Sequence, residues 1–232
     1  MTWLQADAEA EARYRELDEL PAGATAIPSL LSALRDESWR VRRLAAERLG
    51  ALEATAQTMH QLVGMLGQRD DTGARNAAAA VLSQLGAAVV PAIVTLLAHA
   101  DPDQRKFAAD ILGSVGRVEA VGPLVSALED RDPNVRTAAA EALGHVGGPE
   151  ARRALEKLLE SRDVLLRVCA LEGLSELRLP VPLPLIVPLL SDPLTRRSAW
   201  RLLGHVHHPT ASMLTVRALA DRKSTRLNSS HG

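Results

Sequence analysis

The stretch Asp132-Pro-Asn-Val-Arg-Thr-Ala-Ala-Ala-Glu-Ala-Leu-Gly144 decides the fold, because variants of it return along most of the chain. Its arginine, Arg136, has counterparts at positions 42, 75, 105, 167 and 196, so consecutive copies lie 29 to 33 residues apart. A period in this range is typical of a solenoid, in which each unit buries its apolar face against its neighbours. We therefore predict one continuous array of repeats.

Each copy of this stretch predicts a helix, the second of its repeat. Asp132 can cap the helix, and Pro133 takes the first helical position, where its missing N–H costs nothing; Asp101-Pro102 and Asp192-Pro193 repeat the device. Apolar residues follow at helical spacing, as in Val135, Ala139 and Leu143. The position of Gly144 holds glycine or serine in the other copies (Gly50, Ser83, Gly113, Ser175, Gly204), and a glycine there ends the helix or admits another backbone.

A first helix in each repeat is indicated by a proline followed by an apolar run, at Pro28, Pro91, Pro123 and Pro182. We expect two helices of about a dozen residues per repeat. Pro188 falls where a helix interior would lie and predicts a kink or a late start. Ahead of the array, the charged segment from Leu4 to Leu20 reads as a helix that caps the first repeat.

Asp-Pro-x-x-x-Arg at the start of the second helix and Ala-Ala-x-x-Leu-Gly near its end resemble the HEAT-like repeats first described in phycobilin lyases. The resemblance implies an all-α, right-handed α-solenoid of about six and a half helical-hairpin repeats. It covers Ala24 to Ala220, with a capping helix in residues 1–22 and the array in residues 23–220. The expected repeats are 24–53, 54–86, 87–117, 118–147, 148–178, 179–208 and a partial 209–220. The family spans bilin lyases, hydroxylases, DNA glycosylase relatives and scaffolds, so the fold alone says little about function.

The last twelve residues, 221–232, leave the repeat pattern for the string DRKSTRLNSSHG. Codon by codon, this string resembles the translation of a common sequencing adapter, and we expect it to be non-native. The native protein then continues past Ala220, and a natural polar tail is the alternative. If the string is an adapter, the last repeat lacks its natural cap and is expected to expose Leu185, Ile186, Leu189, Leu214 and Leu219, so we predict self-association.

Composition limits the partners. The formal net charge is -1 and aromatic residues make up 2%, which disfavours nucleic acid, since binding it calls for a basic groove with stacking aromatics. The chain has one cysteine, no run of about 18 apolar residues and an acidic N-terminus. We therefore expect a cytoplasmic protein with no disulfide within the chain and no membrane segment.

The regular Asp and Arg pairs are expected to form a structural ladder that holds the stack together. The aspartate caps a helix, and the arginine one turn later bridges to the aspartate of the neighbouring repeat. An anion-binding groove is the rival interpretation. The ladder comprises Arg42, Asp71, Arg75, Asp101, Arg105, Asp132, Arg136, Asp163, Arg167, Asp192 and Arg196.

We find no catalytic or metal-binding constellation in the sequence and expect no cofactor. His205, His207 and His208 follow a helix without the i, i+4 spacing of a metal-binding helix face and without a neighbouring acidic residue or cysteine. No histidine is followed by Glu, whereas the resembling hydroxylases bind iron through His-Glu pairs. His145 occupies the position of His205 in its repeat, which favours packing or capping, and Cys169 reads as a small core residue.

The remaining source of function is the solvent side of the second helices, which lines the concave face of such solenoids. We expect a non-enzymatic scaffold or adaptor that binds a basic or amphipathic segment of another protein there. The alternatives are a phycobilin lyase-like accessory subunit and the regulatory portion of a larger protein. The predicted partner-binding residues are Lys106, Phe107, Asp110, Thr137, Glu141, Val168 and Glu172.

Overall fold

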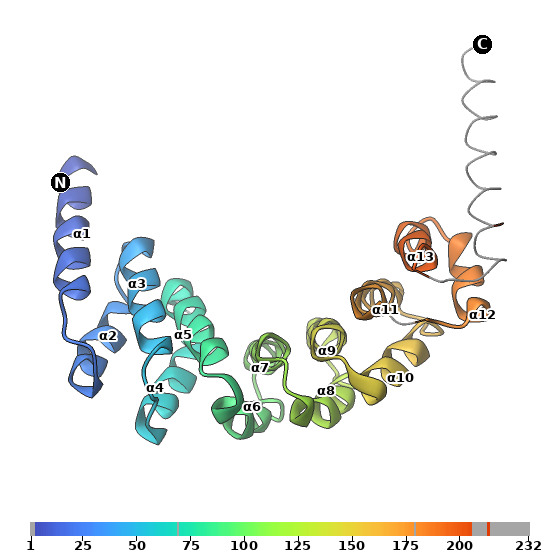
Figure 1. The fold of residues 1–232 in the computed structure, drawn as a ribbon, viewed down its shortest axis with the longest axis horizontal. Coiled ribbons are helices and arrows are strands. Elements are labelled where there is room, and N and C mark those ends of the chain that lie inside the picture. The colour runs from blue at the N-terminus through green and yellow to red at the C-terminus, as the bar shows by residue number, and fades with distance from the viewer. Residues whose placement is uncertain (1–2, 69, 179, 206–212, 214–232) are drawn as a thin grey trace, which may run out of the picture. The chain divides into compact units, whose positions relative to one another are not determined.

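The computed structural model describes residues 3–68, 70–178, 180–205 and 213. Within them the chain forms thirteen α-helices joined by turns and short 3-10 helices, with no strand (Figure 1). This confirms the all-α solenoid predicted from the repeat. Several sequence predictions lie outside the described residues: those on His207, His208, Leu214 and Leu219, on the partial repeat 209–220 and on the tail 221–232.

The chain divides into two compact units, residues 1–123 and 124–232. In the first unit the second helices α3, α5 and α7 pack side by side, and each packs against the first helix of its own hairpin, α2, α4 or α6. The N-terminal helix α1 packs against α3. The helices are α1 (Trp3–Asp18), α2 (Ile27–Ala33), α3 (Trp39–Gly50), α4 (Ala56–Leu66), α5 (Thr72–Gln84), α6 (Val90–Leu96) and α7 (Pro102–Val115), with 3-10 helices at Ala24–Ala26, Gly86–Val89 and Val118–Ala120.

The second unit repeats this arrangement after α8, which crosses the boundary between the units. The second helices α9, α11 and α13 form a row, in which α10 packs against both α9 and α11, and α12 packs against α13. The helices are α8 (Val121–Ala127), α9 (Pro133–Val146), α10 (Gly148–Leu158), α11 (Val164–Leu177), α12 (Leu183–Ile186) and α13 (Arg196–Leu203), with a 3-10 helix, η4, at Val187–Leu190.

Four of the described first helices are shorter than the dozen residues predicted, whereas α4 and α10, with eleven residues each, agree with the prediction. The helices α2, α6 and α8 have seven residues each and follow a 3-10 turn, so the chain reaches the helix by a tighter path. In the sixth repeat α12 has four residues and gives way to η4, where Pro188 removes a backbone donor. The predicted exposure of Ile186 and Leu189 is wrong, because both side chains are buried.

Aspartate capping holds for four second helices and fails for two. Asp71, Asp101, Asp132 and Asp163 are N-caps whose side chains accept backbone N–H groups. Ser38 is an N-cap without a side-chain bond, and its own N–H donates to Asp36 Oδ1 at 2.8 Å. Asp192 does not start a helix: α13 begins at Arg196, after the buried Thr195 donates its hydroxyl to the carbonyl of Leu189 at 2.8 Å.

The core consists of Ala, Leu, Val and Ile side chains, and small residues bring the second helices close together. The closest approach is between α9 and α11, where a Cβ placed on Gly144 would lie 2.7 Å from the Cα of Gly173. The glycine at position 144 therefore admits a neighbouring backbone, one of the two roles predicted for it. Gly173 lies two residues before Ser175, the position equivalent to Gly144 in its repeat, so the aligned copies did not reveal it.

Candidate interaction surface

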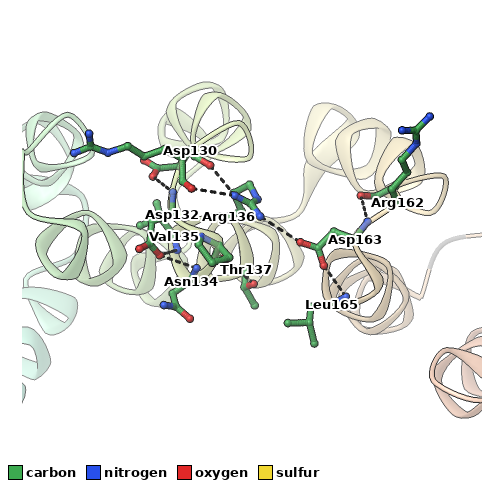
Figure 2. Close-up of polar contacts among 12 residues, drawn as sticks. Asp130, Asp132, Asn134, Val135, Arg136, Thr137, Arg162, Asp163 and Leu165 are labelled. Carbon is green, nitrogen blue, oxygen red and sulfur yellow. Dashed lines mark hydrogen bonds and ion pairs between the residues drawn. The ribbon is translucent and has the colours of Figure 1, made fainter.

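The guanidinium of Arg136 connects three segments of the second unit. Its Nη1 donates to the carbonyls of Asp130 at 3.0 Å and Arg131 at 3.4 Å, in the turn between α8 and α9 (Figure 2). Its Nη2 lies 3.3 Å from Asp163 Oδ2 at the start of α11. One side chain thus fixes the turn of its own repeat and holds the helix start of the next repeat.

The same contacts recur in other repeats. Arg167 Nη1 donates to the carbonyls of Ser161 at 2.8 Å and Arg162 at 3.4 Å, and its Nη2 lies 3.0 Å from Asp192 Oδ2. Arg42, Arg105 and Arg196 each bond the carbonyls six and five residues earlier. The sequence reasoning missed these carbonyl bonds. The signal that could have revealed them is an arginine nine residues after the end of the first helix, as at Arg136 after Ala127 and Arg167 after Leu158.

The aspartates of these contacts have lowered pKa values. At Asp163, burial opposes the charged form, but the backbone N–H of Leu165 and the guanidinium of Arg136 outweigh it, so the pKa falls below its usual range. At Asp192, the backbone N–H of Leu194 and the guanidinium of Arg167 lower the pKa against a smaller effect of burial. Both carboxylates therefore carry their charge at neutral pH within the stack.

The solvent side of α9 and α11 carries carboxylates around a buried thiol. Cys169 Sγ lies 3.9 Å from Glu141 Oε1, and Glu172 Oε1 accepts from the Ser198 hydroxyl at 3.3 Å. Burial, together with the negative charges of Glu141 and Glu172, raises the pKa of the Cys169 thiol to about 12. Both glutamates thus act on the same point, and Cys169 is a neutral core thiol at physiological pH.

Neither Glu141 nor Glu172 forms an ion pair with a lysine or arginine among the described residues. At the equivalent positions of α3 and α7 a cation four residues earlier pairs with the carboxylate, as in Arg43 with Glu47 at 2.8 Å and Lys106 with Asp110 at 2.7 Å. On α9 and α11 the arginines of the repeat, Arg136 and Arg167, turn toward the ladder instead. The face is therefore left with uncompensated negative charge.

Two exposed leucines lie near helix starts of the same unit. Leu165 at the start of α11 is 59% exposed and Leu194, at the equivalent position before α13, is 67% exposed. Figure 2 shows Leu165 projecting from the helix start next to Asp163. Val168, a predicted site residue, follows Leu165 by one turn and is half-buried, whereas Thr137 on α9 donates its hydroxyl to the Pro133 carbonyl of its own helix. The sequence analysis did not single out either leucine.

The predicted site residues of α7, in the first unit, contact one another and α5. Lys106 Nζ lies 2.7 Å from Asp110 Oδ2, so this carboxylate is paired, unlike Glu141 and Glu172. The ring of Phe107 lies under two cations, with Arg75 Cζ at 5.0 Å and Lys106 Nζ at 5.8 Å from its centroid. The three side chains form a compact cluster on this helix.

The described histidines form no metal site. Within the part of the chain that the structure describes, no group of three or more His, Cys, Asp or Glu residues could hold a metal ion. His145 was predicted to pack or cap, but it is exposed and its Nε2 lies 3.5 Å from Glu176 Oε2 on α11. No single described helix is long and apolar enough to cross a membrane, although α5 and the following helical segment to Leu96, bent by 118°, pass that test as a pair.

The repeat pattern and its geometry match a known family. A family model of HEAT repeats matches residues 2–86 and 90–174. This chain belongs to the HEAT-repeat family. No protein of curated function matches the sequence significantly.

One solved structure has a similar fold at a TM-score above 0.5. The complex of CpcE and CpcF of the phycocyanin lyase from Nostoc sp. PCC7120 contains a chain that is 23% identical, with a TM-score of 0.55, covering 65% of this chain and 99% of that one. A designed armadillo repeat protein is 16% identical, with a TM-score of 0.45, covering 78% of this chain and 100% of the designed one. At these identities the likeness concerns the fold alone.

Proposed function

We propose that this HEAT-repeat protein is a non-enzymatic scaffold that binds a basic, amphipathic segment of a partner protein on the solvent side of α9 and α11. The observation that carries the proposal is the uncompensated pair Glu141 and Glu172. Both carboxylates raise the pKa of the same thiol, so their fields overlap, and a cation between them relieves the repulsion.

The apolar part of the partner has a place on the same face. Leu165 and Leu194 occupy equivalent positions of adjacent repeats, and exposed leucines at neighbouring helix starts present apolar area to a ligand. An amphipathic helix can lay apolar side chains over these leucines and Val168 while its lysines or arginines reach Glu141 and Glu172. Thr137 lies on the same side of α9, at the rim of this surface.

The cluster of Lys106, Phe107 and Asp110 stays in the proposal as a secondary contact in the first unit. Lys106 and Asp110 already form an ion pair, and the Phe107 ring already contacts the cations of Arg75 and Lys106. A partner protein therefore gains less binding free energy there than at Glu141 and Glu172. The likeness to a phycocyanin lyase subunit adds no observation in favour of a lyase-like role, since it concerns the fold alone.

Fluorescence anisotropy with a defined peptide tests the proposal. The probe is a fluorescein-labelled 18-residue helix of Leu, Ala and Lys, and its control is the same sequence with Glu in place of Lys. We expect Glu141→Gln with Glu172→Gln to weaken binding of the Lys peptide by roughly tenfold, from about 0.5–1 kcal/mol per lost surface ion pair. The matched control is Glu129→Gln with Glu160→Gln, which removes the same charge from exposed positions after the first helices of the second unit. Equal weakening by both pairs of substitutions would mean that the peptide senses only net charge, and the proposed site would be rejected.

A further inference from the structure

Trp39 is an exposed tryptophan at the start of α3 in the first unit. Its side chain is 62% exposed, although tryptophan is highly buried on average in folded proteins. Together with Arg43 and Glu47, at one-turn intervals along α3, it lines a groove on each side of the helix. We name this row of three side chains the Trp39 ridge.

The larger groove lies between α3 and α5 and has a volume of about 420 Å³. On the α5 side it is lined by Gly73, Ala77 and Ala80 at one-turn spacing, together with Asn76 and Gln84. The guanidinium of Arg42 lies over Gly73. Ala80 holds the repeat position that carries an acidic residue in four other copies, at Glu47, Asp110, Glu141 and Glu172. The side chain of α5 at this position is therefore shorter than in those copies, and the exposed indole of Trp39 lines the same groove.

The smaller groove, of about 180 Å³, lies between α1 and α3. Tyr14 and Arg40 line it together with the Trp39 ridge, and the Arg40 guanidinium carbon lies 5.2 Å from the Tyr14 ring centroid. Tryptophan, tyrosine and arginine are the residues most enriched where protein interfaces concentrate their binding energy. The ridge and its two grooves bring all three types together.

The side chains that line the two grooves carry net positive charge, with Arg40, Arg42 and Arg43 against one carboxylate, Glu47. Arg43 pairs with Glu47 at 2.8 Å, and Arg40 pairs with Glu11 at 3.1 Å, in both cases between partly exposed side chains. Exposed ion pairs of this kind contribute little to folding stability. The carboxylate of a ligand can therefore replace Glu11 or Glu47 as the partner of the arginine at small cost in free energy.

We propose that the Trp39 ridge is a second docking site, which binds an acidic peptide segment through one large apolar side chain. That side chain fills the groove over Ala77 and Ala80 and contacts the indole, while acidic residues on either side of it engage Arg40 and Arg43. The site goes beyond the proposed function, because it lies in the other unit and selects the opposite charge. Nucleic acid fits less well, because the formal net charge of the chain is -1 and aromatic residues make up 2%, whereas nucleic acid calls for an extended basic groove with stacking aromatics.

The test uses labelled peptides and the full chain. The probe is a fluorescein-labelled 12-residue peptide of Asp, Glu, Ser and Gly with one central Phe. Its controls are the same peptide with Ser in place of Phe, the same peptide with Lys in place of the acidic residues, and a labelled single strand of twelve thymidines. We expect Trp39→Ala to weaken binding of the Phe peptide at least about 30-fold, as for a residue at an interface hot spot.

Two further variants keep the result independent of folding. Ala80→Phe fills the groove from an exposed position and should abolish binding while the far-UV circular dichroism stays unchanged. Val118→Ala shortens another exposed apolar side chain of the same unit, 69% exposed, and should leave the affinity unchanged. The site is rejected if Trp39→Ala binds like the wild type, if no peptide binds at millimolar concentration, or if the thymidine strand binds more tightly than the Phe peptide. A loss of self-association in Trp39→Ala without peptide binding would reject it in favour of a second copy of this chain.

Discussion

Replacing Gly144 by Ala should destabilise the second unit, against the usual effect of this substitution in a helix. The added Cβ would lie 2.7 Å from the Cα of Gly173, whereas carbon atoms attract best at about 3.5–4.0 Å. The helices α9 and α11 must therefore move apart by about 1 Å. Because backbone atoms stand on both sides of the contact, no side-chain rotation can relieve it.

The expected magnitude follows from two opposing effects. Overpacking a well-packed core costs about 1–3 kcal/mol, and a contact between two backbones belongs at the upper end of that range. Alanine instead of glycine within a helix regains about 1 kcal/mol. The net loss is about 2 kcal/mol in the free energy of unfolding, which shifts a urea midpoint by about 1 M when the slope is near 2 kcal/mol per M.

Gly64 is the matched control for this experiment. It lies within α4, and a Cβ placed on it meets no atom within 4 Å. Gly64→Ala should therefore raise stability by up to about 1 kcal/mol. Urea unfolding followed by far-UV circular dichroism compares the two variants with the wild type. A Gly144→Ala protein as stable as Gly64→Ala would show that α9 and α11 do not approach as closely as described.

Three further predictions concern the ladder and the thiol. Arg136→Ala should lower the free energy of unfolding in urea by about 2–3 kcal/mol, because two turn carbonyls and Asp163 lose a charged donor. The control is Arg162→Ala, whose exposed side chain points away from the ladder in Figure 2. This substitution should change the free energy of unfolding by less than about 0.5 kcal/mol. Because the pKa of Asp163 is lower in the folded protein, its contribution is complete above the unfolded pKa of about 4 and is lost as the pH falls through the folded pKa. Thermal unfolding between pH 6 and 2.5 should show this loss in the wild type and a flatter profile in Asp163→Asn; parallel profiles would contradict it. Cys169, with a pKa of about 12, should react with a thiol reagent at pH 8 only after denaturation, and rapid labelling of the native protein would contradict its assignment as a core thiol.

The sequence predicted the fold well because the repeat carries its own local signals. Asp132 and Pro133 mark a helix start through capping and backbone geometry, which depend on neighbours in the chain alone. The same reasoning failed at Asp192, where the buried Thr195 bonds back to the preceding 3-10 helix and delays α13 by a turn. That competing bond is a tertiary contact, which a local motif does not contain.

The candidate sites were predicted only in part. Aligning the repeats placed Glu141 and Glu172 at equivalent positions. Whether a cation neutralises each carboxylate depends on side-chain rotamers, which the spacing of residues in the sequence does not determine. Asp110 has the same position and is neutralised by Lys106. Trp39 was not predicted as a site residue, because the groove beside it is formed by α3 together with the small residues of α5. This groove depends on two adjacent repeats and is not apparent from the sequence of either repeat alone.

The arginine contacts also bear on how such an array lengthens during evolution. Arg136 bonds the turn of its own repeat, and its guanidinium pairs with Asp163 of the following repeat. Arg167 makes the same two kinds of contact one repeat later. A segment duplicated in frame over one period thus carries a donor for its successor and an acceptor for its predecessor. Tandem duplication then inserts a fully bonded repeat without any compensating mutation at either junction, and selection can vary the exposed helix positions of each copy separately.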